Sequence, residues 1–149
     1  MKYGFIGCGN MGGAVAAAVA KATHDIMITD RSGKARKIAE ELGILYGDNL
    51  SVAKECDVLF LCVKPHMMKD MLLPLQQVLG QKKPVLISMA AGLTVATIEG
   101  FAGTRLPVIR IMPNTPTAIG KGVIQYCCND LVAEAVLQNW LQDMAPCGL

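Results

Sequence analysis

The segment Gly7-Cys8-Gly9-Asn10-Met11-Gly12 has the spacing G-x-G-x-x-G and lies between an apolar run and an alanine-rich run. The apolar run, 3–7, has the length of a buried strand, and the run from Met11 to Ala22 consists of small residues typical of a closely packed helix. A glycine turn that follows a strand and opens a helix is typical of a βαβ unit. Because these glycines interrupt the apolar stretch, we do not expect a cleavable leader.

Further apolar runs alternate with helical patterns along the rest of the chain. We expect strands at 25–29, 44–46, 57–63, 85–89, 108–112 and 123–127. We expect helices at 33–42 with Ser32 as its N-cap, from about 51, after His66 with a division at Pro74, at 94–101 and at 133–144. Strands that alternate with helices predict a single α/β domain over 1–149, a Rossmann-type, mostly parallel sheet with helices on both faces.

The composition excludes several classes of function. Hydrophobic residues make up 52% of the chain and charged residues 17%, and the net charge is +2. No dense basic run and no long apolar span is present, so we expect neither nucleic-acid nor membrane binding. The six cysteines form no C-x-x-C pair and the two histidines stand apart, so we expect no metal and a reduced, cytoplasmic location.

The glycine turn in this context predicts binding of a dinucleotide. Gly7 permits a tight turn, Gly9 lets the backbone approach a pyrophosphate, and Gly12 allows close packing of helix on strand. Asp30, at the end of the second expected strand, has the position of the acidic residue that holds the adenosine ribose. The motif alone is weak, and the strand–turn–helix context together with Asp30 strengthens it.

The choice between NAD and NADP stays open. The carboxylate of Asp30 repels a 2′-phosphate, whereas Arg31, Ser32 and Lys34 favour one. Open α/β sheets bind ligands at the carboxyl ends of their strands. Further candidates therefore follow the later strands, with Asn114 and Thr115 as candidates for the border of a substrate pocket, although a proline-flanked structural turn explains these two residues equally well.

Four segments of the chain together resemble one known family. These are GFIGCGNMGGA, DVLFLCVKPH, ISMAAGLT and VIRIMPNTPTAIGKGV. In this order they are much more specific than the glycine motif, and the chain resembles the N-terminal domain of pyrroline-5-carboxylate reductase. The resemblance implies transfer of hydride from NADH or NADPH to the C=N bond of 1-pyrroline-5-carboxylate, which gives proline.

The resemblance also implies the residues that contact the cofactor. They are Gly7, Cys8, Gly9, Asn10, Met11 and Gly12 in the turn, Asp30 and Arg31, Asn49, Val63, Lys64 and Pro65, and Ala90, Ala91 and Gly92. No residue of the chain is a convincing general acid, because hydride chemistry belongs to the cofactor.

Members of this family continue beyond the position of Leu149 into a helical domain that forms the homodimer and binds the substrate carboxylate. We therefore expect this chain to be a truncated form that supplies the cofactor-binding half and that alone is inactive and a monomer or weak associate. A related reductase or dehydrogenase and a non-catalytic nucleotide-binding module remain as alternatives.

Overall fold

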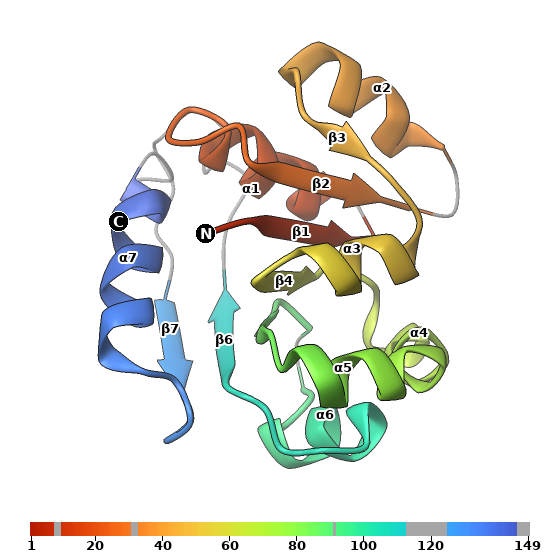
Figure 1. Ribbon diagram of the computed structural model, residues 1–149, viewed down its shortest axis with the longest axis vertical. Coiled ribbons are helices and arrows are strands. Elements are labelled where there is room, and N and C mark those ends of the chain that lie inside the picture. The colour runs from red at the N-terminus through yellow and green to blue at the C-terminus, as the bar shows by residue number, and fades with distance from the viewer. Residues whose placement is uncertain (8–9, 31–32, 91, 113–124, 146–149) are drawn as a thin grey trace.

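The computed structural model describes residues 1–7, 10–30, 33–90, 92–112 and 125–145. Within these residues the strands form one seven-stranded sheet in the order β3-β2-β1-β4-β5-β6-β7 (Figure 1). The strands are β1 (Tyr3–Ile6), β2 (Ile26–Thr29), β3 (Leu45–Tyr46), β4 (Val58–Leu61), β5 (Val85–Ser88), β6 (Val108–Met112) and β7 (Gln125–Cys128).

The order of the strands reverses between β1 and β4. From β1 the chain proceeds outward to β2 and β3, and it then returns to place β4 on the other side of β1. Tyr3 pairs with Ile26 on one side and with Val58 on the other, both in parallel register. Only β7, beside β6, runs antiparallel among the described strands. In open α/β sheets the reversal marks the crevice where ligands bind, here at the carboxyl ends of β1 and β4.

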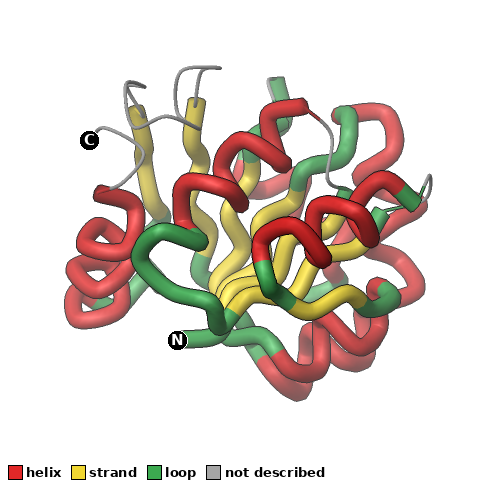
Figure 2. Tube along the Cα trace, turned by 90° about the horizontal axis from the view of Figure 1, so that it is seen from above, coloured by secondary structure: helices red, strands yellow, loops and turns green. Residues whose placement is uncertain are grey.

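Helices cover both faces of the sheet (Figure 2). One face packs against α1 (Asn10–Val19), α2 (Lys34–Leu42) and α7 (Glu134–Met144). The other packs against α3 (Asn49–Glu55), α4 (Met68–Leu72), α5 (Gln76–Lys82) and α6 (Val95–Ala102), and short 3-10 turns at Pro65–Met67 and Leu73–Leu75 flank α4. The predicted fold class is confirmed.

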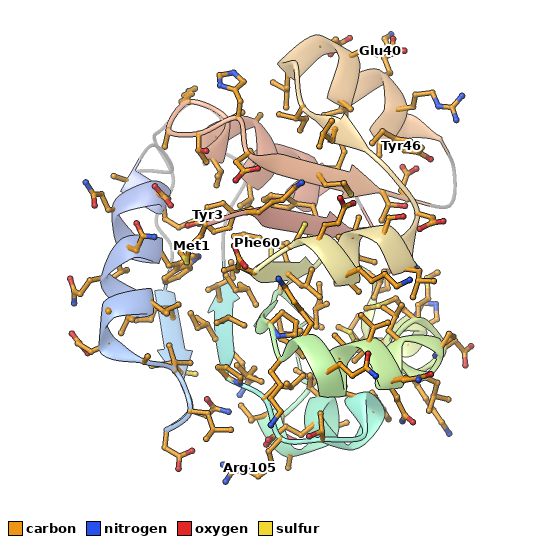
Figure 3. All side chains as sticks on the ribbon, viewed as in Figure 1. Met1, Tyr3, Glu40, Tyr46, Phe60 and Arg105 are labelled. Carbon is orange, nitrogen blue, oxygen red and sulfur yellow. The ribbon has the colours of Figure 1, made fainter. Side chains whose placement is uncertain are left out.

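The alternation of side chains in the central strands divides the core into two parts. In β4, Val58 and Phe60 belong to the core on the α1 face, whereas Leu59 and Leu61 belong to the core on the α3 face. Phe5 of β1 stacks on Phe60 with ring centroids 4.3 Å apart. Figure 3 shows Phe60 and Tyr3 close to each other within the fold. These strands are buried on both faces, as their near-continuous apolar sequences predict.

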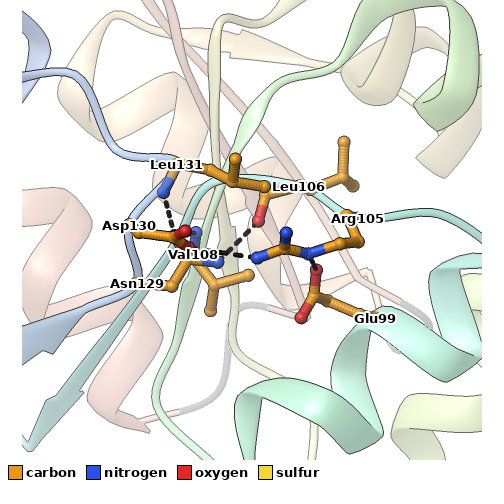
Figure 4. A network of polar contacts seen from close by, with 7 residues as sticks. All are labelled: Glu99, Arg105, Leu106, Val108, Asn129, Asp130 and Leu131. Carbon is orange, nitrogen blue, oxygen red and sulfur yellow. Dashed lines mark hydrogen bonds and ion pairs between the residues drawn. The ribbon is translucent and has the colours of Figure 1, made fainter.

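Three hydrogen bonds join α7 and its preceding loop to the rest of the sheet. The hydroxyl of Tyr3 donates to Asp143 of α7 at 2.5 Å. At the amino end of β6, Asn129 accepts from the Val108 N–H at 3.1 Å and donates to the Leu106 carbonyl at 2.8 Å (Figure 4). These contacts fix the last strand and helix at a distance from the crevice, because they lie at the amino ends of the parallel strands.

The start of α2 differs from the sequence prediction. Its N-cap is Gly33, in the left-handed region with φ 82°, and Ser32, the predicted cap, lies outside the described residues. The side chain of Asp30 takes over the capping, since its two carboxylate oxygens accept from the N–H groups of Gly33 at 2.9 Å and Ala35 at 3.0 Å. A carboxylate in this position also complements the positive end of the helix dipole.

Other elements agree with the prediction to within a few residues. The expected strand 57–63 is shorter, because Pro65 turns the chain into a 3-10 helix, and α1 ends at Val19 rather than at 22. Thr94 caps α6 by accepting from Thr97 N–H at 3.1 Å. No described helix is long and apolar enough to cross a membrane.

Candidate functional site

The first turn of the chain reaches the crevice through Gly7. Its φ is +81°, a conformation that side chains other than glycine rarely adopt. A Cβ added here would lie 2.6 Å from Cγ1 of Val63, and the Gly7 N–H donates to the Thr29 carbonyl at 2.9 Å. Both the backbone conformation and the contact with β4 therefore require glycine.

Gly12, in the first turn of α1, lies against the end of β4. A Cβ at Gly12 would lie 2.8 Å from Cβ and 2.9 Å from Sγ of Cys62, and 3.2 Å from the carbonyl oxygen of Gly7. The missing side chain lets the amino end of α1 approach the sheet at the point where the strand order reverses. The first N–H groups of a helix have no partner within the helix and form an anion site. The role predicted for Gly12 in packing is confirmed.

A pocket of about 250 Å³ opens beside this turn. The ends of β1 and β2, the start of α3, the segment after β4, the 3-10 turn Pro65–Met67 and α4 contribute to it. The described residues that line it are Ile6, Gly7, Asp30, Asn49, Val63, Met67, Asp70 and Met71. Because the lining combines apolar side chains with the polar side chains of Asp30, Asn49 and Asp70, the pocket suits a flat group with polar edges.

A second hollow of about 570 Å³ adjoins the first and shares Asp30 and Asn49 with it. It extends between β3, α3 and the turn that holds Pro74. Its other described lining residues are Thr29, Tyr46, Gly47, Asp48, Leu50 and Leu75, with Pro74 itself. The guanidinium of Arg36 stacks on the ring of Tyr46, 5.2 Å from its centroid.

The acidic side chains at this edge also shape the backbone. Asp30 caps α2, as described above, and Asp48 caps α3 by accepting from Ser51 N–H at 2.8 Å. That hydrogen bond holds the pKa of the exposed Asp48 carboxyl below its usual value. The cap fixes the start of α3, so that Asn49 contributes to both hollows.

The structure brings together four of the residues that the sequence singled out, namely Gly7, Asp30, Asn49 and Val63. Lys64 and Pro65 do not line the described pockets, and Pro65 begins the 3-10 helix. After β5, Ala90 is buried and Gly92 has a φ of +82°. Cys8, Gly9, Arg31, Ala91, Asn114 and Thr115 lie outside the described residues, as do the side chains of Asn10 and Met11. The contacts of all these residues with a ligand stay predictions.

The wall that α4 and the 3-10 turn before it contribute was not predicted from the sequence. Met67, Asp70 and Met71 line the pocket, although the sequence around them reads as an ordinary surface helix. The position of this segment in the sequence could have indicated its role. The segment directly follows β4, so it begins at the carboxyl edge of the sheet, where the crevice lies.

Comparison with known proteins agrees with this geometry. The model of the family described as NADP oxidoreductase coenzyme F420-dependent matches residues 2–92. The pyrroline-5-carboxylate reductase of Corynebacterium melassecola is 38% identical over 125 residues, which cover 79% of this chain and 46% of that protein. That of Aquifex aeolicus is 30% identical over 151 residues, which cover 99% of this chain and 56% of that protein. The chain thus spans about half the length of these relatives.

Two solved reductase structures also superpose on this chain over about half of their own length. A pyrroline-5-carboxylate reductase from Coxiella burnetii superposes with a TM-score of 0.89 and 32% identity, over 99% of this chain and 57% of that chain. The pyrroline carboxylate reductase of Plasmodium falciparum, solved with NADP bound, superposes with a TM-score of 0.86 and 28% identity, over 100% of this chain and 56% of that chain.

Proposed function

We propose that this chain, which belongs to the NADP oxidoreductase, coenzyme F420-dependent family, is the dinucleotide-binding half of a pyrroline-5-carboxylate reductase. The observation that carries the proposal is the close packing of Gly7 on Val63 and of Gly12 on Cys62 at the reversal of the strand order. The identity of 30–38% with curated reductases supports the choice of substrate. The cofactor is NAD(P)H and the substrate is the small molecule 1-pyrroline-5-carboxylate.

The residues of the chain have distinct tasks in this proposal. The amino end of α1 and the glycine turn bind the pyrophosphate through backbone N–H groups. Asp30 and Asn49 face the adenosine, where an amide side chain can both donate and accept. The exposed backbone of Gly92, after β5, leaves space for the nicotinamide end. Residues 1–149 form one domain with this single task.

The reaction adds a hydride to the carbon of the substrate C=N bond and a proton to its nitrogen, so that proline and oxidised cofactor result. When bound, NAD(P)H supplies the hydride. This chain holds and orients the cofactor at the carboxyl edge of the sheet, because positioning is what a hydride transfer requires of the protein. In this proposal the substrate carboxylate site and the dimer contacts belong to the part of the reductases that this chain does not span, and the enzyme works in the cytoplasm.

The test has two steps. The polypeptide of residues 1–149 is titrated with NADH and NADPH by fluorescence, and we expect saturable binding without turnover of 1-pyrroline-5-carboxylate. A chimera that joins these residues to the remaining part of the Coxiella burnetii reductase is then assayed at 340 nm. We expect oxidation of NAD(P)H that depends on 1-pyrroline-5-carboxylate. A folded chimera that binds NAD(P)H but does not oxidise it with this substrate would contradict the proposed reaction.

A further inference from the structure

A further hollow lies at the amino ends of the parallel strands, at the opposite edge of the sheet from the crevice. Its volume is about 290 Å³. Segments far apart in the sequence line it, namely the first residue of the chain, the residue before β4, the end of α5 with the start of β5, the residue before β6, and the loop and first turn of α7. None of its described lining residues belongs to the two hollows of the crevice, so it is a separate site.

Most of the side chains that line this hollow are apolar. Pro84 and Val85 are buried, Val136 of α7 is half-buried, and Leu131 is exposed over 39% of its surface. The side chain of Asn129 fixes the loop that carries Leu131, because its Oδ1 accepts from the Leu131 N–H at 3.2 Å and from the Val108 N–H at 3.1 Å (Figure 4). The hollow therefore has a preformed apolar wall.

The charged side chains of the hollow leave one cation over. Asp57 is the only carboxylate among the described lining residues, and it is paired, since it accepts from the Lys2 N–H at 2.9 Å and lies 3.5 Å from the ammonium of Lys82. The ammonium of Lys83 forms no hydrogen bond or ion pair with any residue that the structure describes. An anion in the hollow would therefore find an unpaired cation beside it.

The backbone of Lys83 is left-handed, with φ 51°, and no other described residue except glycine has a positive φ. The helices α2 and α6 end in the same conformation on glycines, Gly43 and Gly103. A glycine adopts this conformation without strain, so the end of α5 does not itself require a lysine. Strained backbone is typical of positions that bind a ligand, and here it carries a cation at the edge of an apolar hollow.

We propose that this hollow binds a small carboxylate with an apolar body. The carboxylate pairs with the ammonium of Lys83, and the apolar body contacts the wall of Pro84, Val85, Leu131 and Val136. Pockets for small molecules typically measure about 300–1,000 Å³, so a hollow at the lower end of this range takes a small ligand. Because Lys83 is exposed, water and salt screen its charge, and the apolar contacts supply much of the affinity.

The experiment is an NMR titration of the 149-residue chain at low salt with two probes, phenylacetate and its uncharged analogue phenylacetamide. Phenylacetate should shift the backbone amide signals of Lys83, Val85, Leu131 and Val136 together, with one Kd in roughly the millimolar range. The amides of the crevice, such as that of Val63, should not move. Phenylacetamide should shift the same signals with a higher Kd, because it lacks the charge.

Three variants separate the charge from the apolar wall. Lys83→Asn removes the cation, and asparagine tolerates the left-handed backbone, so the Kd of phenylacetate should rise by about two- to fivefold while that of phenylacetamide stays constant. Leu131→Ser should raise both dissociation constants, because it removes part of the wall. Lys54→Asn, which replaces an exposed lysine of α3, is the matched control and should change neither.

Two results would overturn the proposal. One is a folded wild-type chain in which phenylacetate causes no saturable shift at these amides, or shifts only signals elsewhere. The other is a Lys83→Asn variant that binds phenylacetate as tightly as Lys54→Asn does. The dispersion of the amide signals shows in the same spectra that each variant is folded. Since neither probe is a dinucleotide, the outcome is independent of the proposed function.

Discussion

Replacement of Gly12 by alanine tests the packing on which the site depends. The new Cβ would lie 2.8 Å from Cβ of Cys62 and 3.2 Å from the carbonyl oxygen of Gly7. Carbon atoms in good contact are about 3.5–4.0 Å apart, so the amino end of α1 must move away from β4 by several tenths of an ångström or more. Overpacking of this kind costs about 1–3 kcal/mol. In a domain of this size each kcal/mol lowers the Tm by about 2–4 °C.

The same movement displaces the N–H groups that bind the pyrophosphate. We therefore expect Gly12→Ala to lower both the Tm and the affinity for NAD(P)H, by about tenfold or more for the latter, since loss of one hydrogen bond to a charged group costs about 1.5–3 kcal/mol and about 1.4 kcal/mol is tenfold in affinity.

Gly80→Ala in α5 is the matched control for this variant, because a Cβ there meets nothing within 4 Å. It should raise stability by about 0.5–1 kcal/mol through helix propensity and leave binding unchanged. Calorimetry and fluorescence titration measure both quantities. A Gly12→Ala variant that behaves like Gly80→Ala would refute the packing argument.

Three further predictions concern the glycine turn, Asp30 and the core. Gly9→Val should abolish NAD(P)H binding and leave the circular dichroism spectrum unchanged, since the pyrophosphate approaches the backbone there; unchanged affinity would contradict it. Asp30→Ser should lower the affinity for NADH more than that for NADPH, with some loss for both because the cap of α2 is lost. An unchanged ratio of the two dissociation constants would show that Asp30 does not lie at the ribose. Burial and the hydrogen bond to Asp143 raise the pKa of Tyr3, so the fold loses stability as the pH rises above about 10, where an unfolded tyrosine ionises. Urea unfolding at pH 8 and 10.5 should show a smaller loss for Tyr3→Phe than for the wild type, and equal losses would contradict this.

Much of the architecture could be predicted because its signals are local. The runs 57–63 and 85–89 are apolar on both faces, which is typical of parallel strands between two layers of helices. Glycines at 7 and 12 mark the turn, and the structure shows why each lacks a side chain. The direction of β7 was not predictable in this way, since a strand pattern does not encode the direction in which it pairs.

The cap of α2 shows a different limit. Two side chains before this helix, Asp30 and Ser32, can both accept from its first N–H groups, and sequence alone does not decide between them. In the structure Gly33 has a φ of 82° and brings the chain back over Asp30, which then accepts from two N–H groups. The residue expected at the ribose therefore also caps the start of α2.

The wall formed by α4 could not be predicted from spacing. Asp70 and Met71 are separated by about 40 residues from Asp30, and they meet it only because β4 returns to the side of β1. A short helix with mixed charged and apolar residues resembles any surface helix. Its contribution to the site follows from the topology of the sheet.

An NMR titration of the 149-residue chain with NADH tests most directly whether the crevice at β1 and β4 binds a dinucleotide. The backbone amide signals of Gly7, Gly12, Asn49 and Val63 should shift together and saturate at one equivalent, because these residues surround the turn and the pocket. The amide of Val108, which is hydrogen-bonded at the opposite edge of the sheet, should not move. Shifts confined to that opposite edge, or no saturable shift in a folded chain, would contradict the account.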